Sequence, residues 1–202
     1  MSSVEIHQIS PQISVWQRYD PALKADLFST ALLTDIGLYL VDPIPLPPDE
    51  VRALGGEREI AGIVVTNANH ARSAAQHSKT FAAPIFAHRD TFPELDASEL
   101  KEIKDGSVLR GELEIIEIPG AAAGEIAIYA AADGGTIIVG DALINFEPYG
   151  FTFLPGKYCQ GEKQMRVSLR KLLEHPAERL LFAHGMPILK EATARLRGLL
   201  EE

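Results

Sequence analysis

The polar segment 66–72 has more capacity for chemistry than any other stretch of the sequence. Its polar members are Thr66, Asn67, Asn69, His70 and Arg72. Amide, imidazole and guanidinium groups can hold a ligand, carry a proton or balance a buried carboxylate. The segment follows an apolar run, 60–65, that is typical of a buried strand, and a helix is predicted over 71–80. Because ligands in α/β proteins bind beyond the carboxyl ends of strands, we expect the site to form around this turn.

Two other strand ends carry ionisable side chains. Asp141 follows the apolar run 136–139, and His184 follows the run 180–183. A carboxylate and an imidazole at strand ends could hold a metal ion or act as general acid and base. The structural alternatives are a turn residue for Asp141 and a hydrogen-bonded core histidine for His184. His88, after the run 83–87, is a further candidate for the same crevice.

Alternating strands and helices must position these side chains. We expect strands at 12–16 (an edge strand), 27–33, 37–41, 60–65, 83–87, 107–109, 113–118, 126–130, 136–139 and 180–183, and helices at 49–54, 71–80, 162–173 and 189–200. The turns 34–37 and 133–135 predict hairpins. The polar stretch 94–103 is expected to be a surface helix or loop, and the aromatic-rich stretch 146–158 a loop that could close over the crevice. Strands followed by helices in each half favour a sandwich of sheets with helices on both outer faces.

Composition limits the classes of partner. With 202 residues, the chain can form one domain over 1–202 with a substantial core. Its net charge of -9 argues against nucleic acid or an anionic membrane as the main partner. Cys159 is the sole cysteine, which excludes an internal disulfide. No signal-peptide pattern or membrane-length apolar run is present, so a cytoplasmic protein is expected.

The segment 66–72 resembles the metal-binding signature of the metallo-β-lactamase fold superfamily, in which a strand ends in Thr-His-x-His-x-Asp-His. Four other matches follow the order of that family. They are Asp42-Pro43 after the opening hairpin, 119–124 for the Pro-Gly-His-Thr-x-Gly loop, Gly140-Asp141 for the metal-bridging Gly-Asp, and 183–187 for Gly-His-Gly-x-Pro. The resemblance covers nearly the whole chain. It implies the four-layer αββα sandwich of glyoxalase II-like, metal-dependent hydrolases.

The same resemblance implies that most of the metal ligands are replaced. Asp141 and His184 keep the residue types of the family, whereas His70 falls on a position that is not a ligand. The remaining ligand positions are occupied by Asn67, Asn69, Ala71, Arg72 and Ala121. Neutral amides bind divalent ions weakly and alanine offers no donor. We therefore expect no metal, and a bidentate Arg72–Asp141 ion pair with Asn67, Asn69 and His184 around it.

Three classes of function stay open. The first is a metal-free relative of the hydrolases that binds a small molecule or a partner in the former active-site crevice. The second is a thioester, lactone or phosphoester hydrolase with one divalent metal on Asp141, His184 and either an asparagine or His70. A metal-free general-base mechanism using Asp141, His184 and His70 is a variant of the second class. The third is a structural or interaction module, such as a homodimer, because a fold does not by itself imply an activity.

Overall fold

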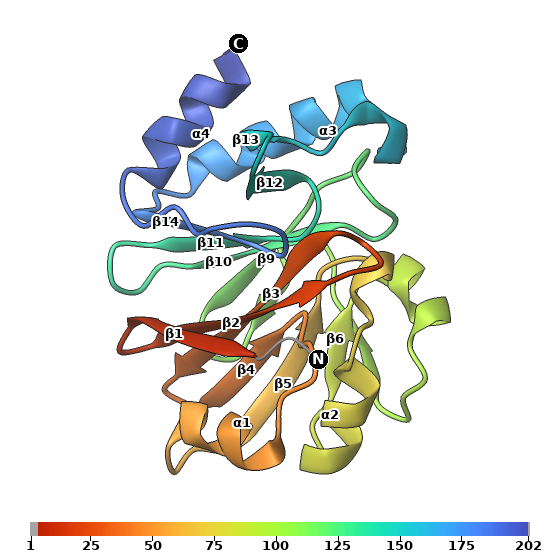
Figure 1. Cartoon of the computed structure of the whole chain (residues 1–202), viewed down its shortest axis with the longest axis vertical. Helices are drawn as coiled ribbons and strands as arrows, with labels where there is room; N and C mark the ends of the chain where they lie inside the picture. The colour runs from red at the N-terminus through yellow and green to blue at the C-terminus, as the bar shows by residue number, and fades with distance from the viewer. Residues whose placement is uncertain (1–3, 202) are drawn as a thin grey trace.

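The computed structural model describes residues 4–201 and has four layers. Two β-sheets lie against each other in the middle, and helices cover the outer face of each sheet (Figure 1). Helices α1 (Pro48–Gly55) and α2 (Ala74–Phe81) lie on one side, and α3 (Glu162–Leu169) and α4 (Ala192–Glu201) on the other. The predicted αββα sandwich is therefore confirmed.

The first sheet has seven strands in sequence order. They are β1 (Glu5–Ser10), β2 (Ile13–Asp20), β3 (Ala25–Thr34), β4 (Gly37–Val41), β5 (Ile60–Val65), β6 (Ile85–Ala87) and β7 (Leu100–Glu102). Strands β1 to β4 pair antiparallel, and β4 to β7 pair parallel. The parallel part brings the carboxyl ends of β4, β5 and β6 to one edge of the molecule.

The second sheet has five strands in the order β14, β11, β10, β9, β8. Their bounds are β8 (Val108–Leu109), β9 (Leu113–Glu117), β10 (Ile126–Ala130), β11 (Thr136–Val139) and β14 (Arg179–Phe182). Only the β11–β14 pair is parallel. A separate hairpin joins β12 (Leu143–Phe146) and β13 (Gly150–Phe153), and 3-10 turns lie at Ala68–His70, Arg89–Glu94, Gly156–Tyr158 and Arg170–Glu174.

Both faces of each sheet are buried, and alternate residues fill different cores. In β4, Tyr39 and Val41 pack between the sheets, whereas Leu38 and Leu40 pack under α1 and α2. In β10, Ile128 packs between the sheets and Ala127 towards α3 and α4. Each fully buried aliphatic side chain stabilises the fold by about 1.5–3 kcal/mol. This double burial explains why the central strands are continuous apolar runs.

Expectations for the central strands are confirmed, whereas those for the edges are partly wrong. The strand at 60–65 and the hairpin of β10 and β11 have the predicted bounds. The strand at 12–16 is not an edge strand, because β1 pairs with its outer side. The stretch 94–103 contains β7, and 146–158 contains β13, where we expected no strand. Within the described residues, none of the helices is long and apolar enough to cross a membrane.

Candidate functional site

The ends of two parallel strand pairs, one from each sheet, meet at a single edge of the sandwich. Asp42 follows β4, and the turn carrying His70 follows β5 in the first sheet. Asp141 follows β11, and His184 follows β14 in the second sheet. Residues that are far apart in the sequence are therefore brought together at the carboxyl ends of the strands, as expected for an α/β site.

Three side chains that could hold a metal ion converge at this edge. The Nε2 atom of His70 lies 3.1 Å from Oδ1 of Asp141 and 3.3 Å from Nε2 of His184. His184 Nε2 is 3.4 Å from the same Asp141 oxygen. Within residues 4–201 this is the one cluster of three or more histidine, cysteine or acidic side chains close enough together to share a metal ion.

A second layer of contacts orients both imidazoles. Oδ2 of Asp42 lies 2.9 Å from Nδ1 of His70 and accepts the Thr66 hydroxyl at 2.5 Å. The backbone N–H of Thr66 donates to Oδ1 of Asp42 at 2.8 Å, and Asp42 is 2% exposed. The ring of His184 makes a hydrogen bond to the backbone of Asp26. Because their other nitrogens are occupied, both histidines direct Nε2 towards Asp141.

Local geometry explains how the sequence places the two histidines. Oδ1 of Asn67 accepts the backbone N–H of Asn69 at 2.9 Å, a side-chain turn that starts the 3-10 segment Ala68–His70. This turn directs His70 inwards, where it is 2% exposed. After His184 the backbone of Gly185 has φ 110°, and an added Cβ would collide with the Asn145 carbonyl. Glycine is therefore required there.

The second carboxylate oxygen of Asp141 binds two amides. Oδ2 accepts hydrogen bonds from Nδ2 of Asn67 at 3.2 Å and from Nδ2 of Asn69 at 3.1 Å. The orientation of the Asn67 amide follows from its Oδ1 contact with the Asn69 backbone. Both asparagines therefore present N–H donors, rather than carbonyl oxygens, to Asp141.

Glu125 is a site residue that the sequence reasoning missed. It is 4% exposed, and its Oε2 accepts Nδ2 of Asn67 at 2.7 Å. Its Oε1 accepts the backbone N–H of Ala142 at 3.0 Å, directly after Asp141. Glu125 belongs to no recognised motif. The available signal was a carboxylate immediately before the apolar run 126–130, since glutamate is rarely fully buried unless it is paired.

The predicted ion pair between Arg72 and Asp141 is wrong. The Arg72 guanidinium donates to three backbone carbonyls, those of Phe28 at 2.6 Å, Asp42 at 3.1 Å and Ala183 at 3.4 Å. Among the ion pairs of the described residues, the cationic partner of Asp141 is histidine. His70 lies between two carboxylates, so Arg72 is left to bind carbonyls at the strand ends.

The pKa values of the cluster move in opposite directions. Burial opposes protonation of His70, but the carboxylates of Asp141 and Asp42 raise its pKa to about 9. Burial, together with the positive charge of His70, lowers the pKa of His184 to about 4. Burial and the nearby Asp141 raise the pKa of Glu125 to about 8. Although burial opposes it, His70 holds the pKa of Asp141 well below its usual range. Without a bound ion at neutral pH, two carboxylates thus face two cations, His70 and Arg72.

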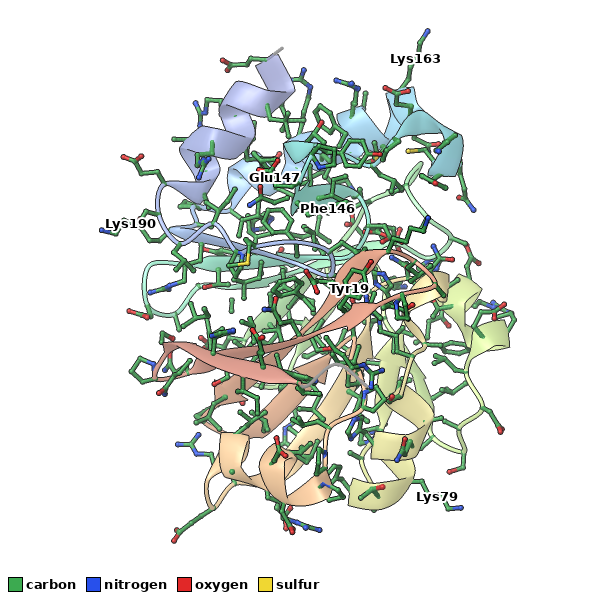
Figure 2. All side chains as sticks on the ribbon, viewed as in Figure 1. Tyr19, Lys79, Phe146, Glu147, Lys163 and Lys190 are labelled. Atoms are coloured by element: carbon green, nitrogen blue, oxygen red, sulfur yellow. The ribbon has the colours of Figure 1, made fainter. Side chains whose placement is uncertain are left out.

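A cavity of about 1190 Å³ lies against this cluster. Asn69, His70, Arg72, Asp141 and His184 all contribute to its surface. The turn between β2 and β3 and the segment that starts at Phe146, the last residue of β12, form its walls. Figure 2 labels Phe146 and Glu147 of that segment. The expectation that 146–158 borders the crevice therefore holds for Tyr149 and Tyr158, whereas Phe151 packs on Phe182 with ring centroids 5.8 Å apart.

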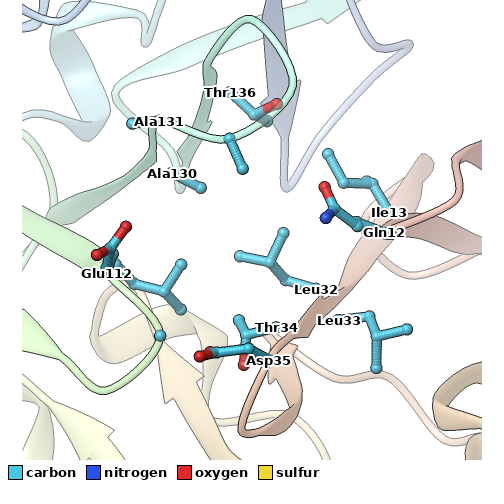
Figure 3. Close-up of a pocket in the computed structure, with 13 residues that line it drawn as sticks. Gln12, Ile13, Leu32, Leu33, Thr34, Asp35, Glu112, Ala130, Ala131 and Thr136 are labelled. Atoms are coloured by element: carbon cyan, nitrogen blue, oxygen red, sulfur yellow. The ribbon is translucent and has the colours of Figure 1, made fainter.

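Two other features lie outside the cluster. His88 is paired with Glu117 at 3.5 Å and Asp90 at 3.7 Å. A smaller cavity of about 320 Å³ opens at the opposite ends of β3 and β4, where Asp35 and Glu112 lie near its edge (Figure 3). Neither feature contributes to the His70–Asp141–His184 arrangement.

The family model of the metallo-beta-lactamase superfamily matches residues 5–202. The chain belongs to this superfamily. It is similar to a metallo-beta-lactamase from Pontibacter korlensis, with TM-score 0.77, 14% identity, and 99% of this chain and 100% of that chain covered. It also resembles a metallo-beta-lactamase family protein from Thermus thermophilus, with TM-score 0.71, 18% identity, and coverage of 96% and 78%.

A third similar structure of this superfamily fold is described as TTHA1623 in a di-iron-bound form. Its TM-score is 0.64 at 22% identity, with 89% of this chain and 97% of that chain covered. No curated protein matches the sequence. At these identities the structures establish the fold alone. In this member of the metallo-beta-lactamase superfamily, the side chains that could hold an ion are His70, Asp141 and His184.

Proposed function

We propose that this chain is a hydrolase that works with a single divalent metal ion held by His70, Asp141 and His184. The observation that carries the proposal is the convergence of two Nε2 atoms and one carboxylate oxygen, with separations of 3.1, 3.3 and 3.4 Å. Ligands of a tetrahedral zinc ion with bonds of about 2.0–2.1 Å lie about 3.3 Å apart. The three donors therefore have the spacing that one ion requires.

The surroundings of the donors support this proposal. Metal-binding histidines commonly donate their second nitrogen to a carboxylate or a carbonyl, which fixes the ring and the tautomer. The carboxylate of Asp42 makes this second hydrogen bond with His70, and the backbone of Asp26 makes it with His184. The expectation of a metal-free site rested on the replaced ligand positions and on Arg72 neutralising Asp141. Because Arg72 binds backbone carbonyls, the second of these two supports is removed.

The donor set suits one ion rather than two. Oδ2 of Asp141 already accepts two amide N–H groups, so Oδ1 would be the oxygen that holds an ion. The side chains of Asn67 and Asn69 present their amide nitrogens, not their oxygens, to Oδ2 of Asp141. Ala121, at another expected ligand position, is buried, and its methyl side chain has no atom that could bind a metal ion. We infer that this part of a dinuclear site has been replaced by a hydrogen-bond network that includes Glu125.

When bound, the ion would supply Lewis-acid polarisation of a carbonyl or phosphoryl oxygen and activation of water. The residues of the chain would do the positioning. Asp42 holds the His70 ring, and Asn67 and Asn69 fix the carboxylate of Asp141 so that one oxygen faces the two imidazoles. The adjacent cavity is large enough for a small organic substrate, so we propose a small molecule rather than a macromolecule as its occupant.

The test is metal analysis of protein purified without chelator, followed by assays with aryl esters, thioesters and phosphodiesters. We expect about one equivalent of zinc, iron or manganese per chain, and activity that a chelator removes and that metal restores. His70→Gln, Asp141→Asn and His184→Gln should each lose the metal. His88→Gln, which changes a histidine at another strand end, is the matched control and should keep it. Two equivalents per chain, or full activity without metal, would contradict the proposal.

A metal-free binding protein is the second candidate function, and the charge balance of the cluster favours it. Asp42 and Asp141 are offset by His70 and Arg72 without any ion. In that case the purified protein would take up no metal on reconstitution, and its folding and ligand binding would be unchanged by chelator. The metal analysis above therefore separates the two candidates directly.

A further inference from the structure

We propose that the substrates of this site are amphipathic anions, with an apolar body and a remote carboxylate or phosphate bound by Lys24 and Lys157. This inference rests on the proposed hydrolase function, because it assigns a substrate class to the same cavity. It comes from the two walls of the cavity, which belong to segments far apart in the sequence: the turn between β2 and β3 and the residues after β12.

The outer parts of both walls are apolar and exposed. Leu23 of the β2–β3 turn is 63% exposed, and Tyr149 and Tyr158 of the opposite wall are 60% and 62% exposed. Deeper lining residues, Leu27 and Ile144, are buried and apolar. Large apolar side chains left uncovered around a cavity are typical of a ligand-binding surface. The body of the substrate should therefore be apolar.

Basic side chains occupy both walls. Arg18 comes from the end of β2, Lys24 comes from the β2–β3 turn, and Lys157 comes from the opposite wall. Among residues 4–201, none of these three forms an ion pair within 4.0 Å, unlike the basic residues that pair elsewhere on the surface. Nζ of Lys157 lies 4.7 Å from the centre of the Tyr158 ring, which holds the ammonium group beside an exposed aromatic face.

The acidic lining residues do not cancel this charge. One is Asp20, whose Oδ1 accepts the backbone N–H groups of Ala22 and Leu23 at 2.8 and 3.2 Å. That carboxylate closes the turn. The other acid outside the metal cluster is Glu147. The walls outside the metal cluster thus carry three basic and two acidic side chains. In the whole chain the acidic residues outnumber the basic ones, 28 to 19. A negatively charged substrate group is the complement of such walls.

The volume of the cavity, about 1190 Å³, fits a substrate with separated parts. It exceeds the range of about 300–1000 Å³ that is usual for small-molecule sites. A scissile carbonyl can lie at the His70–Asp141–His184 cluster while the apolar body covers the inner walls and the anion meets the lysines. Because Lys24 and Lys157 are exposed, their interaction should affect KM and its salt dependence more than kcat.

The experiment compares esters that differ only at the remote end. The metal-loaded protein is assayed with 4-nitrophenyl octanoate, with the mono-4-nitrophenyl ester of octanedioic acid, and with an analogue ending in a phosphonate. We expect the charged esters to have a KM about tenfold lower than the neutral ester, with similar kcat, and the difference to shrink in high salt. The ratio between the carboxylate and the phosphonate identifies which anion is preferred.

Charge-reversal variants locate the effect. The double variant Lys24→Glu, Lys157→Glu should lose the preference for charged esters, seen as a rise of their KM to at least that of the neutral ester. The double variant Lys79→Glu, Lys163→Glu changes the net charge equally. These two lysines project from opposite ends of the molecule (Figure 2), so this control should keep the preference. Equal KM values for charged and neutral esters, or an equal loss in both double variants, would overturn the inference.

Binding without turnover separates this inference from the proposed function. Calorimetry with the mono-anilide of octanedioic acid and with octananilide requires no catalysis. Preferential, lysine-dependent binding of the acid with no ester cleavage would refute the hydrolase function and support the anion site. Cleavage of all esters with no preference would support the hydrolase function and overturn the anion site.

Discussion

Asp141 uses its two carboxylate oxygens for different purposes. Oδ2 accepts amide hydrogens from Asn67 and Asn69, and Oδ1 faces the imidazoles of His70 and His184. An aspartate bound in this way directs one oxygen, Oδ1, towards the side chains that could hold an ion. Its other oxygen is engaged by the two amides.

The residue types at this site could be predicted from the sequence, but their partners could not. Asn67, Asn69, His70, Arg72, Asp141 and His184 all lie at the same edge of the sandwich. The choice of His70 over Arg72 as the partner of Asp141 depends on a side-chain turn and on the backbone carbonyls that lie within reach of Arg72. Residue spacing does not carry that information, and Glu125 was missed for the same reason.

His70 should make the stability of the metal-free protein depend on pH. Its folded-state pKa of about 9 lies above the usual value of 6.5. Its contribution is therefore fully present below pH 6.5 and is lost as the pH rises through about 9. Over that window we expect the free energy of unfolding to fall by about 3 kcal/mol. Glu125, with its pKa raised from 4.5 to about 8, acts in the same direction.

Urea unfolding in the presence of chelator, at pH values from 6 to 10, measures this effect. His70→Gln should remove about half of the pH dependence in this range and leave the part due to Glu125, whereas His88→Gln should retain all of it. A wild-type protein equally stable at pH 6 and pH 10 would show that His70 is not held as a cation.

At the scale of secondary-structure elements, the burial of a strand determines whether the strand can be predicted from the sequence. Strands β5, β10 and β11 are covered on both faces and are therefore predictable as continuous apolar runs. Strands β1 and β7 lie at the sheet edges, and all of their residues are exposed or half-buried. Their backbones are held by hydrogen bonds to a neighbouring strand, which leaves no hydrophobic pattern to detect.

The turn after β11 tolerates no side chain at Gly140. A Cβ there would lie 2.5 Å from Thr66 Oγ1 and 2.8 Å from both Asn67 Nδ2 and Glu125 Oε1. Gly140→Ala should therefore displace the network that orients Asp141. We expect metal affinity to fall by about 10–100-fold, as for other disrupted second-layer contacts.

Competition with a chromogenic chelator measures that affinity. Gly198→Ala is the matched control, because nothing lies within 4 Å of its added Cβ in helix α4. This control should leave metal binding unchanged and stabilise the helix by about 0.5–1 kcal/mol. If Gly140→Ala binds metal as tightly as the control, the network does not position Asp141.

On the scale of the whole molecule, Arg72 connects the two sheets. Its guanidinium binds the carbonyl of Phe28 in β3, that of Asp42 after β4, and that of Ala183 after β14. A backbone hydrogen bond from Phe28 to Ala183, at 3.0 Å, crosses the same boundary. The residue expected to replace a metal charge thus acts as a link between the halves of the sandwich.

Arg72→Lys should weaken that link while keeping the charge. An ammonium group is a compact donor and cannot span three carbonyls as the planar guanidinium does. The loss of charge-assisted hydrogen bonds to these carbonyls should lower the free energy of unfolding by about 1–3 kcal/mol, although the carbonyls of Ala183 and Asp42 keep the donors Phe28 N–H and Ser29 Oγ. Denaturant unfolding measures the change, with Arg89→Lys, at an exposed position, as the control. Equal stability of the two variants would contradict the role of Arg72.

The position of Arg72 has a consequence for ligand binding. The same guanidinium contributes to the surface of the large cavity and binds carbonyls from both sheets. A ligand that contacts Arg72 would therefore also stabilise the contact between the two halves of the sandwich. Separation of the sheets should in turn disrupt this part of the cavity surface and weaken ligand binding.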